Sequence, residues 1–179
     1  MSQIKIRKTA VDDIEEGFRL VNRIWRIAYA HIMPKEIFDQ RDAALDEKIK
    51  KAKEAGVNKD GRIDYVAVDG DRIVAIVKGT SVSGYKRYRN MDYADLTAVY
   101  IDPEYQRQGL GKKLFDKVVE FFKSQGRTRM TIGVLKENHA ARKAYEKWGG
   151  RLDGYEKYFV KQGHSFPEVF YLYDLDTGA

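Results

Sequence analysis

Two short runs of this sequence hold residues whose types and spacing could do chemistry. The first is Gln106–Lys112, QRQGLGK, in which two glycines stand among basic and amide side chains. Glycine has no Cβ, so the backbone at Gly109 and Gly111 can approach a bulky group closely. Apolar residues recur at helical spacing from Leu110 onward, which places a helix start in this run. The unpaired N–H groups of a helix start bind anions, so the run predicts a phosphate cradle.

Other phosphate-binding patterns do not fit the first run. A Walker A loop requires a Lys-Ser or Lys-Thr pair after its last glycine, and the chain has none in that position. A dinucleotide fingerprint requires a third glycine where this chain has Leu114. From the two glycines alone, a plain turn between a strand and a helix is the simpler interpretation.

The second run is Asn138–Gly150, NHAARKAYEKWGG, which follows an expected strand. Asn138 is a good N-cap by residue type, and Ala141 and Tyr145 share one face of the expected helix. Taken by itself, this pattern fits a capped helix with a core tyrosine.

Together the two runs resemble the GNAT superfamily of N-acetyltransferases. The order Gln106-x-x-Gly109-x-Gly111 after a strand is similar to the acetyl-CoA motif Q/R-x-x-G-x-G/A of that family. The second run resembles the family pattern N-x-x-A-x-x-x-Y-x-K-x-G-F, except that Gly150 stands where the family has an aromatic residue. The resemblance is strong over about 63–173 and weak before it.

The resemblance implies acetyl-CoA as the acyl donor. The pantetheine arm would pair with the backbone of Val99 and Ile101, in a gap between two splayed strands. Asn138 would contact the cofactor, and Tyr145 would lie near its sulfur, as a general acid or as a hydrogen-bond donor to the sulfur. The full set of expected cofactor-binding residues is Val99, Tyr100, Ile101, Gln106, Arg107, Gln108, Gly109, Leu110, Gly111, Lys112, Asn138 and Tyr145.

The implied reaction is direct attack of a primary amine on the thioester, which requires a base because such an amine has a pKa of about 10.4. Asp95 lies fourteen residues before Gly109, where several family members carry a catalytic Glu. The residues alone leave open whether Asp95 is that base or only ends a loop. His31 is a second candidate base by residue type. We expect the acceptor, a small molecule or a peptide, to meet Trp25, Tyr29 and His31.

Hydrophobic periodicity predicts a mixed α/β fold, in which a mixed sheet has helices on both sides. The family resemblance implies a mostly antiparallel sheet of about seven strands, with strands 4 and 5 splayed apart. An Asp-Gly pair at Asp69-Gly70 predicts a hairpin, and Asp12 or Asp13 is expected to cap the first helix. The segment 79–93 is expected to be a polar loop. Expected strands are 3–8, 63–68, 72–78, 95–101, 129–135, 151–160 and 168–175; expected helices begin near 13, 35, 43, 110 and 138.

Composition limits the class of protein. The 179 residues are 43% hydrophobic and 34% charged, which predicts one ordinary globular domain over the whole chain. There is no cysteine, which excludes disulfides and Cys-based zinc sites, and there is no leader-like start and no long apolar span. We expect a cytoplasmic protein without membrane contact, and we expect no metal. The net charge of +6 is spread along the chain, which argues against a nucleic-acid partner. A homodimer and a catalytically inactive acyl-CoA sensor both remain possible from the sequence.

Overall fold

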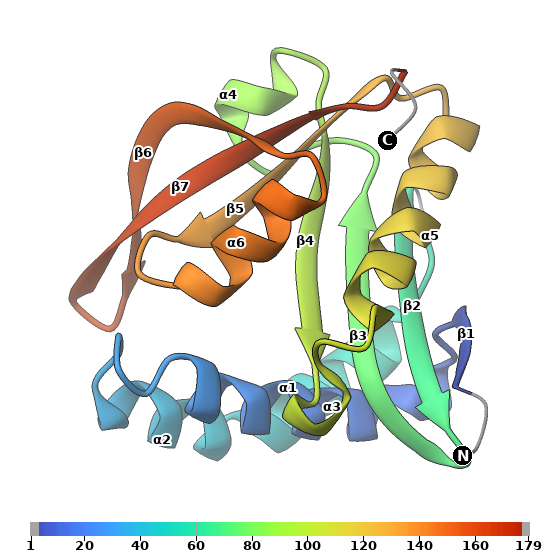
Figure 1. The fold of residues 1–179 in the computed structure, drawn as a ribbon. Helices are drawn as coiled ribbons and strands as arrows, with labels where there is room; N and C mark the ends of the chain where they lie inside the picture. The colour runs from blue at the N-terminus through green and yellow to red at the C-terminus, as the bar shows by residue number, and fades with distance from the viewer. Residues whose placement is uncertain (1–3, 60, 177–179) are drawn as a thin grey trace. The chain divides into compact units, whose positions relative to one another are not determined.

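The computed structural model describes residues 4–59 and 61–176 (Figure 1). It divides into two compact units, which we describe separately. Unit 1 comprises residues 1–79 and 98–118, and unit 2 comprises residues 80–97 and 119–179. Strand β4 (Ala94–Ile101) and helix α5 (Leu110–Ser124) each contribute residues to both.

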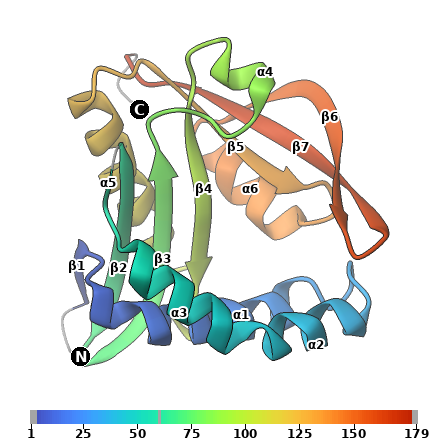
Figure 2. The same cartoon turned by 180° about the vertical axis from the view of Figure 1, so that it is seen from behind.

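Unit 1 has strands in the order β1-β2-β3-β4. Helices α1 to α3 cover one face of these strands and the start of α5 lies on the other, as Figures 1 and 2 show from opposite sides. Besides β4 and α5, its elements are β1 (Lys5–Lys8), α1 (Ile14–Ala28), α2 (Lys35–Ala43), α3 (Leu45–Ala55), β2 (Arg62–Asp69), β3 (Arg72–Thr80) and two short 3-10 turns, η1 (Val11–Asp13) and η2 (Pro103–Tyr105).

The expected hairpin is present between β2 and β3. Gly70 has a φ of 62° in its turn, a left-handed conformation that glycine adopts without strain. The apolar stripe of α1 packs onto this hairpin, because Leu20 and Ile24 join Val66, Ile73 and Ile76 in one buried cluster. Burying such side chains contributes about 1.5–3 kcal/mol each.

Asp13 stands at the expected N-cap position of α1, but the expectation that its side chain caps this helix was wrong. Asp13 precedes α1, but its side chain makes no capping hydrogen bond to that helix. Its carboxylate instead accepts hydrogen bonds from the Arg7 guanidinium and from the Ala10 N–H. The ion pair with Arg7 holds the carboxylate away from the helix, so Asp13 ties β1 to the turn before α1.

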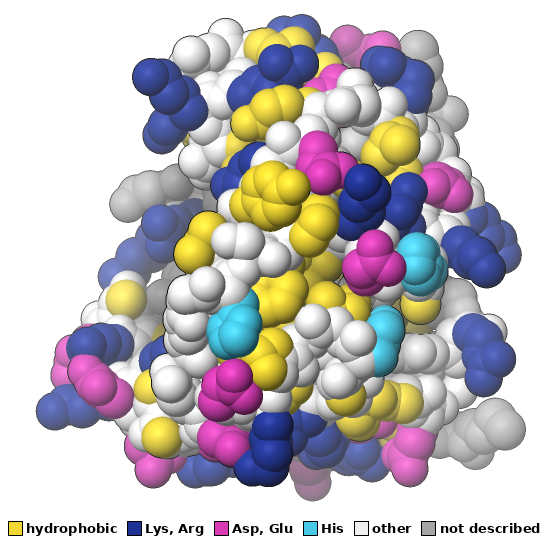
Figure 3. Space-filling model, turned by 90° about the vertical axis from the view of Figure 1, so that its left-hand side faces the viewer, with side chains coloured by type: hydrophobic (Ala, Val, Ile, Leu, Met, Phe, Trp, Pro, Cys, Tyr) yellow, Lys and Arg dark blue, Asp and Glu magenta, His cyan; other side chains and the backbone are white. Residues whose placement is uncertain are grey.

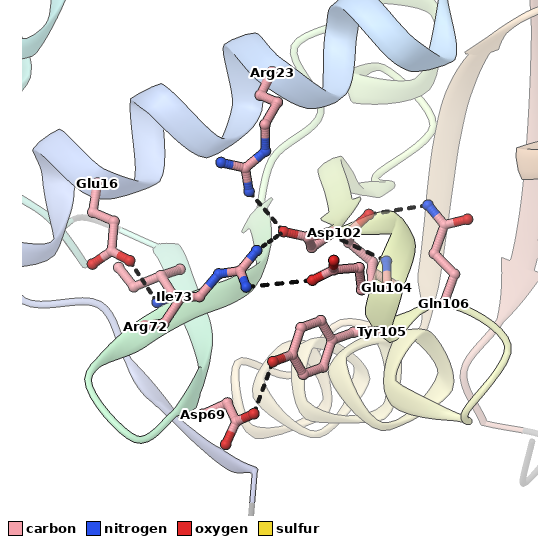
Figure 4. A network of polar contacts seen from close by, with 10 residues as sticks. Glu16, Arg23, Asp69, Arg72, Ile73, Asp102, Glu104, Tyr105 and Gln106 are labelled. Carbon is pink, nitrogen blue, oxygen red and sulfur yellow. Dashed lines mark hydrogen bonds and ion pairs between the residues drawn. The ribbon is translucent and has the colours of Figure 1, made fainter.

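A buried carboxylate joins three elements of unit 1 (Figure 4). Asp102 Oδ2 lies 2.6 Å from Arg23 of α1 and 2.6 Å from Arg72 of β3. Its Oδ1 accepts a hydrogen bond from the Glu104 N–H of η2. Burial alone would raise the pKa of Asp102, but the Glu104 N–H and the two guanidinium groups outweigh it and lower that pKa. The carboxylate thus fixes the end of β4 just before the expected cradle.

Unit 2 has strands in the order β4-β5-β7-β6, with β4 and β5 parallel and the other pairs antiparallel. Helix α6 lies against β5 and β7 (Figure 1). Besides residues of β4 and α5, its elements are α4 (Lys86–Arg89), β5 (Arg129–Leu135), α6 (His139–Lys147), β6 (Arg151–Lys161) and β7 (His164–Asp174).

Two expectations for unit 2 need correction. The segment 79–93 is not only a polar loop, since it contains α4, whose Tyr88 is fully buried against Tyr93 and Phe170. The last strand begins at His164, four residues earlier than expected, because a tight turn at Gln162 and Gly163 lets it pair with β6 along its length.

The glycine that departs from the family pattern has a steric reason. A Cβ placed on Gly150 would lie 2.6 Å from the Tyr173 hydroxyl and 2.8 Å from the Tyr145 carbonyl oxygen. Those two groups form a buried hydrogen bond of 2.8 Å. Tyr173 therefore fills the space that an aromatic residue at 150 would need.

The seven strands, the parallel pairing of β4 with β5 and the flanking helices confirm the predicted fold class. Within residues 4–59 and 61–176, none of the helices combines the length and apolar character that crossing a bilayer requires. On the face shown in Figure 3, basic side chains are interspersed with acidic and hydrophobic ones.

Replacing Asp102 with asparagine tests the junction. Asp102→Asn keeps the size of the side chain but leaves two half-exposed guanidinium groups without their buried partner, so we expect a loss of about 2 kcal/mol in the free energy of unfolding. The control Glu104→Gln removes an exposed partner of Arg72 at 3.4 Å and should cost under about 0.5 kcal/mol. Urea unfolding at pH 7 measures both.

The pH dependence gives this prediction a direction. The lowered pKa of Asp102 means that its contribution is present above the unfolded pKa and is lost as pH falls through the folded value. The difference in the free energy of unfolding between wild type and Asp102→Asn should therefore become smaller below about pH 4. Equal stability of the two proteins at pH 7 would contradict a structural role for the carboxylate.

Candidate active site

The first predicted run forms the expected helix start in unit 1. The Lys113 N–H donates to the Gly109 carbonyl at 3.2 Å, which leaves the N–H groups of Leu110, Gly111 and Lys112 without a helical acceptor. Gly109 has a φ of 81°, and a Cβ placed on it would meet nothing within 4 Å. The loop is therefore open at the point where its N–H groups lie, as an anion cradle requires.

The polar side chains of this run mainly support the loop. Gln106 Nε2 donates to the Ile101 carbonyl at 3.0 Å, and Gln108 Nε2 donates to the Glu104 carbonyl at 2.8 Å. Figure 4 shows Gln106 beside the Asp102 junction. Lys112 forms an ion pair with Asp116 one turn along α5. Arg107 has a φ of 59° and is exposed, so its cation remains at the surface of the loop.

The residues expected to meet the acceptor lie beside β4 in unit 1. Trp25 Nε1 donates to the Tyr100 hydroxyl at 2.9 Å, and the Tyr29 ring packs edge-on against Trp25. Burial raises the pKa of Tyr100. The Arg41 guanidinium stacks 3.8 Å from the Trp25 ring centre. Tyr100 thus directs its side chain to α1, while His31 is exposed in the turn after Tyr29 and has no partner among the described residues.

A pocket opens in unit 2 where β4 leaves β5. The two strands pair only at Ala94 with Met130 and at Asp95 with Thr131, although both continue further. Beyond these pairs lies a cavity of about 330 Å³. Its lining consists of Gly84, Tyr85, Asp95, Leu96, Thr97, Gly133 and Lys157.

Asp95 is buried at this pocket, with 2% of its surface exposed. Its Oδ2 accepts hydrogen bonds from the Ser83 hydroxyl and the Gly84 N–H, each at 3.3 Å, and its Oδ1 is buried without a partner among the described residues. Burial raises the pKa of Asp95 to about 6, against these two hydrogen bonds and with help from the charge of Glu168. A carboxylate with this pKa can take up a proton near neutral pH.

Glu168 is a second carboxylate near the pocket. It is buried on β7, and its Oε1 accepts a hydrogen bond of 2.7 Å from the Tyr85 hydroxyl. Burial raises the pKa of Tyr85, and the Glu168 carboxylate raises it further, so Tyr85 stays protonated and donates. A Cβ on Gly133 would lie 2.6 Å from the Tyr85 hydroxyl and 2.8 Å from Glu168 Oε1. Glycine at 133 is therefore what allows this hydrogen bond to form beside β5.

The second predicted run lies in unit 2 and forms helix α6. Asn138 caps this helix, since its Oδ1 accepts from the Ala141 N–H at 3.2 Å. Tyr145 is buried, and its ring packs against Trp148 and Tyr171. Asn138 is therefore the N-cap of α6 and Tyr145 a core aromatic residue, as the residues alone suggested.

Sequence reasoning missed Glu168, Tyr85, Gly133 and Lys157 as residues of one site. The segment 79–93 was expected to be a polar loop, and nothing linked it to Glu168, which is 83 positions from Tyr85. The sequence feature that pointed to this site was Glu168, a glutamate inside an otherwise apolar final strand. The residues that pair with Glu168 depend on the order of strands in the sheet, which the sequence pattern does not give. Within the described residues, no group of three or more His, Cys, Asp or Glu side chains is placed to hold a metal ion.

Comparison with known proteins identifies the family. The pattern of the Acetyltransferase (GNAT) family matches residues 19–150. A [ribosomal protein bS18]-alanine N-acetyltransferase of Escherichia coli (strain K12) is 36% identical over 59 residues, which cover 33% of this chain and 40% of that protein. A spermidine N(1)-acetyltransferase of Thermoplasma acidophilum is 23% identical over 152 residues, 84% of this chain and 89% of that protein.

A solved structure shows the same fold. The PaiA N-acetyltransferase from Thermoplasma acidophilum, crystallised with coenzyme A, superposes with a TM-score of 0.66 at 19% identity and covers 96% of this chain and 99% of its own. The chain belongs to the GNAT acetyltransferase family. It spans about half the length, or less, of the first curated relatives that it matches.

The raised pKa of Asp95 predicts a stability effect. A carboxylate whose folded pKa exceeds its unfolded value of 3.8 contributes stability below the unfolded value, and this is lost as pH rises through about 6. Ionising Asp95 in the folded state therefore costs up to about 3 kcal/mol at pH 8. Asp95→Asn removes this cost. Its amide nitrogen is, however, a buried donor without an acceptor, which lowers stability by about 1–2 kcal/mol.

We expect Asp95→Asn to be more stable than wild type by about 1–2 kcal/mol at pH 8 and no more stable at pH 4. Thermal unfolding at both pH values measures the difference. The exposed Asp174→Asn on β7 is the matched control and should change little at either pH. A variant less stable than wild type at pH 8 would argue that Asp95 is not held in a costly environment.

Proposed function

We propose that this chain transfers the acetyl group of acetyl-CoA to a primary amine. The observation that carries the proposal is Asp95, a buried carboxylate with a raised pKa at a pocket beside β4. The same strand continues to Ile101 and leads through η2 into the glycine loop before α5. Membership of the GNAT family supports the reaction class, and the names of the relatives support an amine acceptor.

The glycine loop has the features that a pyrophosphate needs. Three N–H groups lack helical acceptors, and the space before Gly109 is open. The positive end of the α5 dipole adds to their attraction for an anion. Gly109, Leu110, Gly111 and Lys112 would bind the pyrophosphate, and the backbone of Val99 and Ile101 would bind the pantetheine arm. Acetyl-CoA, when bound, supplies the acetyl thioester.

Asp95 would act on the acceptor. An alkyl amine is almost entirely protonated at pH 7, so its neutral form lies about 4–5 kcal/mol uphill. The Asp95 carboxylate is mostly ionised at that pH and can receive the ammonium proton, directly or through water. Tyr145 is the proposed donor of a proton or hydrogen bond to the departing thiolate, and Asn138 a proposed contact to the cofactor.

The pocket supports a cationic acceptor. Asp95 and Glu168 place two carboxylates at or beside it, and the Tyr85 ring offers an aromatic surface to a cation. A polyamine, an amino-acid amide or a protein N-terminus fits this chemistry. Trp25, Tyr29 and His31 are proposed as further acceptor contacts.

The cofactor proposal is tested with two matched glutamate variants. Gly109 and Gly126 are both exposed, both have positive φ values and both have open space at the Cβ position. Gly109→Glu adds a carboxylate in front of the cradle and should weaken acetyl-CoA binding by at least about 100-fold, through charge repulsion and blocked access. Gly126→Glu imposes the same backbone strain and charge elsewhere and should bind like wild type.

Calorimetric titration with acetyl-CoA measures both affinities, and thiol release with a panel of amines measures transfer. Equal affinity of the two variants would contradict the cradle. Binding by wild type without thiol release from any amine would instead favour an acyl-CoA sensor of the same fold.

The base is tested by the pH dependence of turnover. With an alkyl amine acceptor, the logarithm of kcat/KM should bend near pH 6, because Asp95 is protonated and inactive below that value. Asp95→Asn should lose this bend and about 100-fold or more in rate. Tyr145→Phe keeps the buried ring and should lower kcat while the bend stays. A bend that survives in Asp95→Asn would assign the base to another group.

A further inference from the structure

One side chain of the pocket is itself a primary amine. Lys157 of β6 lines the cavity together with Asp95 and Thr97. Its Nζ lies 3.7 Å from Glu168 Oε2 and 4.6 Å from the centre of the Tyr85 ring. The side chain is 39% exposed, so the ammonium group lies at the pocket and is still accessible to solvent. Lys157 thus occupies the kind of environment that we propose for the ammonium of an acceptor.

We propose that Lys157 is an acetyl acceptor and that the protein acetylates this lysine on its own chain. The inference rests on the proposed function, since it uses the same donor and the same base. It adds a specific modification site, which follows from the position of Lys157 and from the carboxylates around it. Placing an amine beside a reaction centre within one molecule raises its effective concentration greatly.

The step balances with groups already named. The Lys157 ammonium gives one proton to the Asp95 carboxylate, directly or through water. The neutral Nζ attacks the carbonyl carbon of the acyl thioester, so a C–N bond forms and the C–S bond breaks. The sulfur leaves as a thiolate and takes a proton from Tyr145 or water, and the nitrogen loses its second proton to solvent. The products are an N-acetyl-lysine, which carries no charge, and a free thiol.

The other lysine of the same strand is placed differently. Lys161 is four positions further along β6, where it pairs with His164 at the end of the hairpin. It does not line the cavity, whereas Lys157 does. Lys161 therefore provides a matched control, because it has the same chemistry and the same strand but lies away from Asp95.

The experiment incubates the purified chain with acetyl-CoA, without added amine, at pH 8. Intact-mass spectrometry follows acetylation over time, and peptide mapping locates the label. We expect one acetyl group, on Lys157, added at least about tenfold faster than at any other lysine. The rate constant should not depend on protein concentration. Lys157→Arg should abolish this phase, Lys161→Arg should keep it, and Asp95→Asn should slow it by about 100-fold.

A parallel assay of wild type with an amine panel separates the two ideas. Thiol release with amines but no preferential label on Lys157 overturns the self-acetylation and leaves the proposed function standing. Neither thiol release nor label, despite acetyl-CoA binding, overturns both. Label on Lys157 that persists at the same rate in urea-unfolded chain, or whose rate constant rises with protein concentration, overturns transfer within one chain.

Discussion

Strand β4 pairs with β5 through only two residues, Ala94 and Asp95, and the candidate site depends on this early parting. A longer parallel ladder would occupy the backbone of β4 and close the space that Leu96, Thr97 and Gly133 now line. Parallel pairing needs a crossover between the strands, and here the crossover contains α5. Strand β4 therefore leads, through η2 and the glycine loop, into the helix whose start is the expected cradle. The residues that line the pocket on β4 and the glycine loop before α5 therefore lie in consecutive segments of the chain.

The two aspartates near the ends of β4 show how the environment sets the chemistry of one residue type. Asp102 meets two guanidinium groups and a backbone N–H, and its pKa falls. Asp95 is buried, and this burial, with help from the charge of Glu168, raises its pKa to about 6 against hydrogen bonds from one N–H and one hydroxyl. Asp102 therefore stabilises the fold as a carboxylate. Asp95 costs stability as a carboxylate, because burial disfavours its charged form.

The pocket also has a carboxylate and an aromatic ring beside an ammonium group, and these belong to Glu168, Tyr85 and Lys157. The hydrogen bond from Tyr85 to Glu168 requires glycine at 133, since any side chain there would meet both groups. The ammonium of Lys157 then lies between a carboxylate and an aromatic ring. This combination recognises a cation by charge and by cation–π contact, and it would serve an external amine and a lysine of the chain alike.

Local patterns in the sequence were sufficient to predict the fold class, the hairpin at Gly70, the helix starts at Leu110 and after Asn138, and the position of Asp95 on β4. These features depend on local periodicity, on turn residues and on spacing along the chain, and all are readable without long-range contacts. The tertiary structure decided the rest. It turned Asp13 from a cap to a partner of Arg7, buried Tyr88, and brought Glu168 to Tyr85 across 83 positions.

The physical reason is that burial and charge pairing are properties of neighbours in space. The pKa of Asp95 depends on desolvation and on Glu168 of another strand, and no pattern within 94–101 contains that information. Burial at the pocket raises the pKa of Asp95, and the strand order, which places β7 beside β5, adds the charge of Glu168 to that effect.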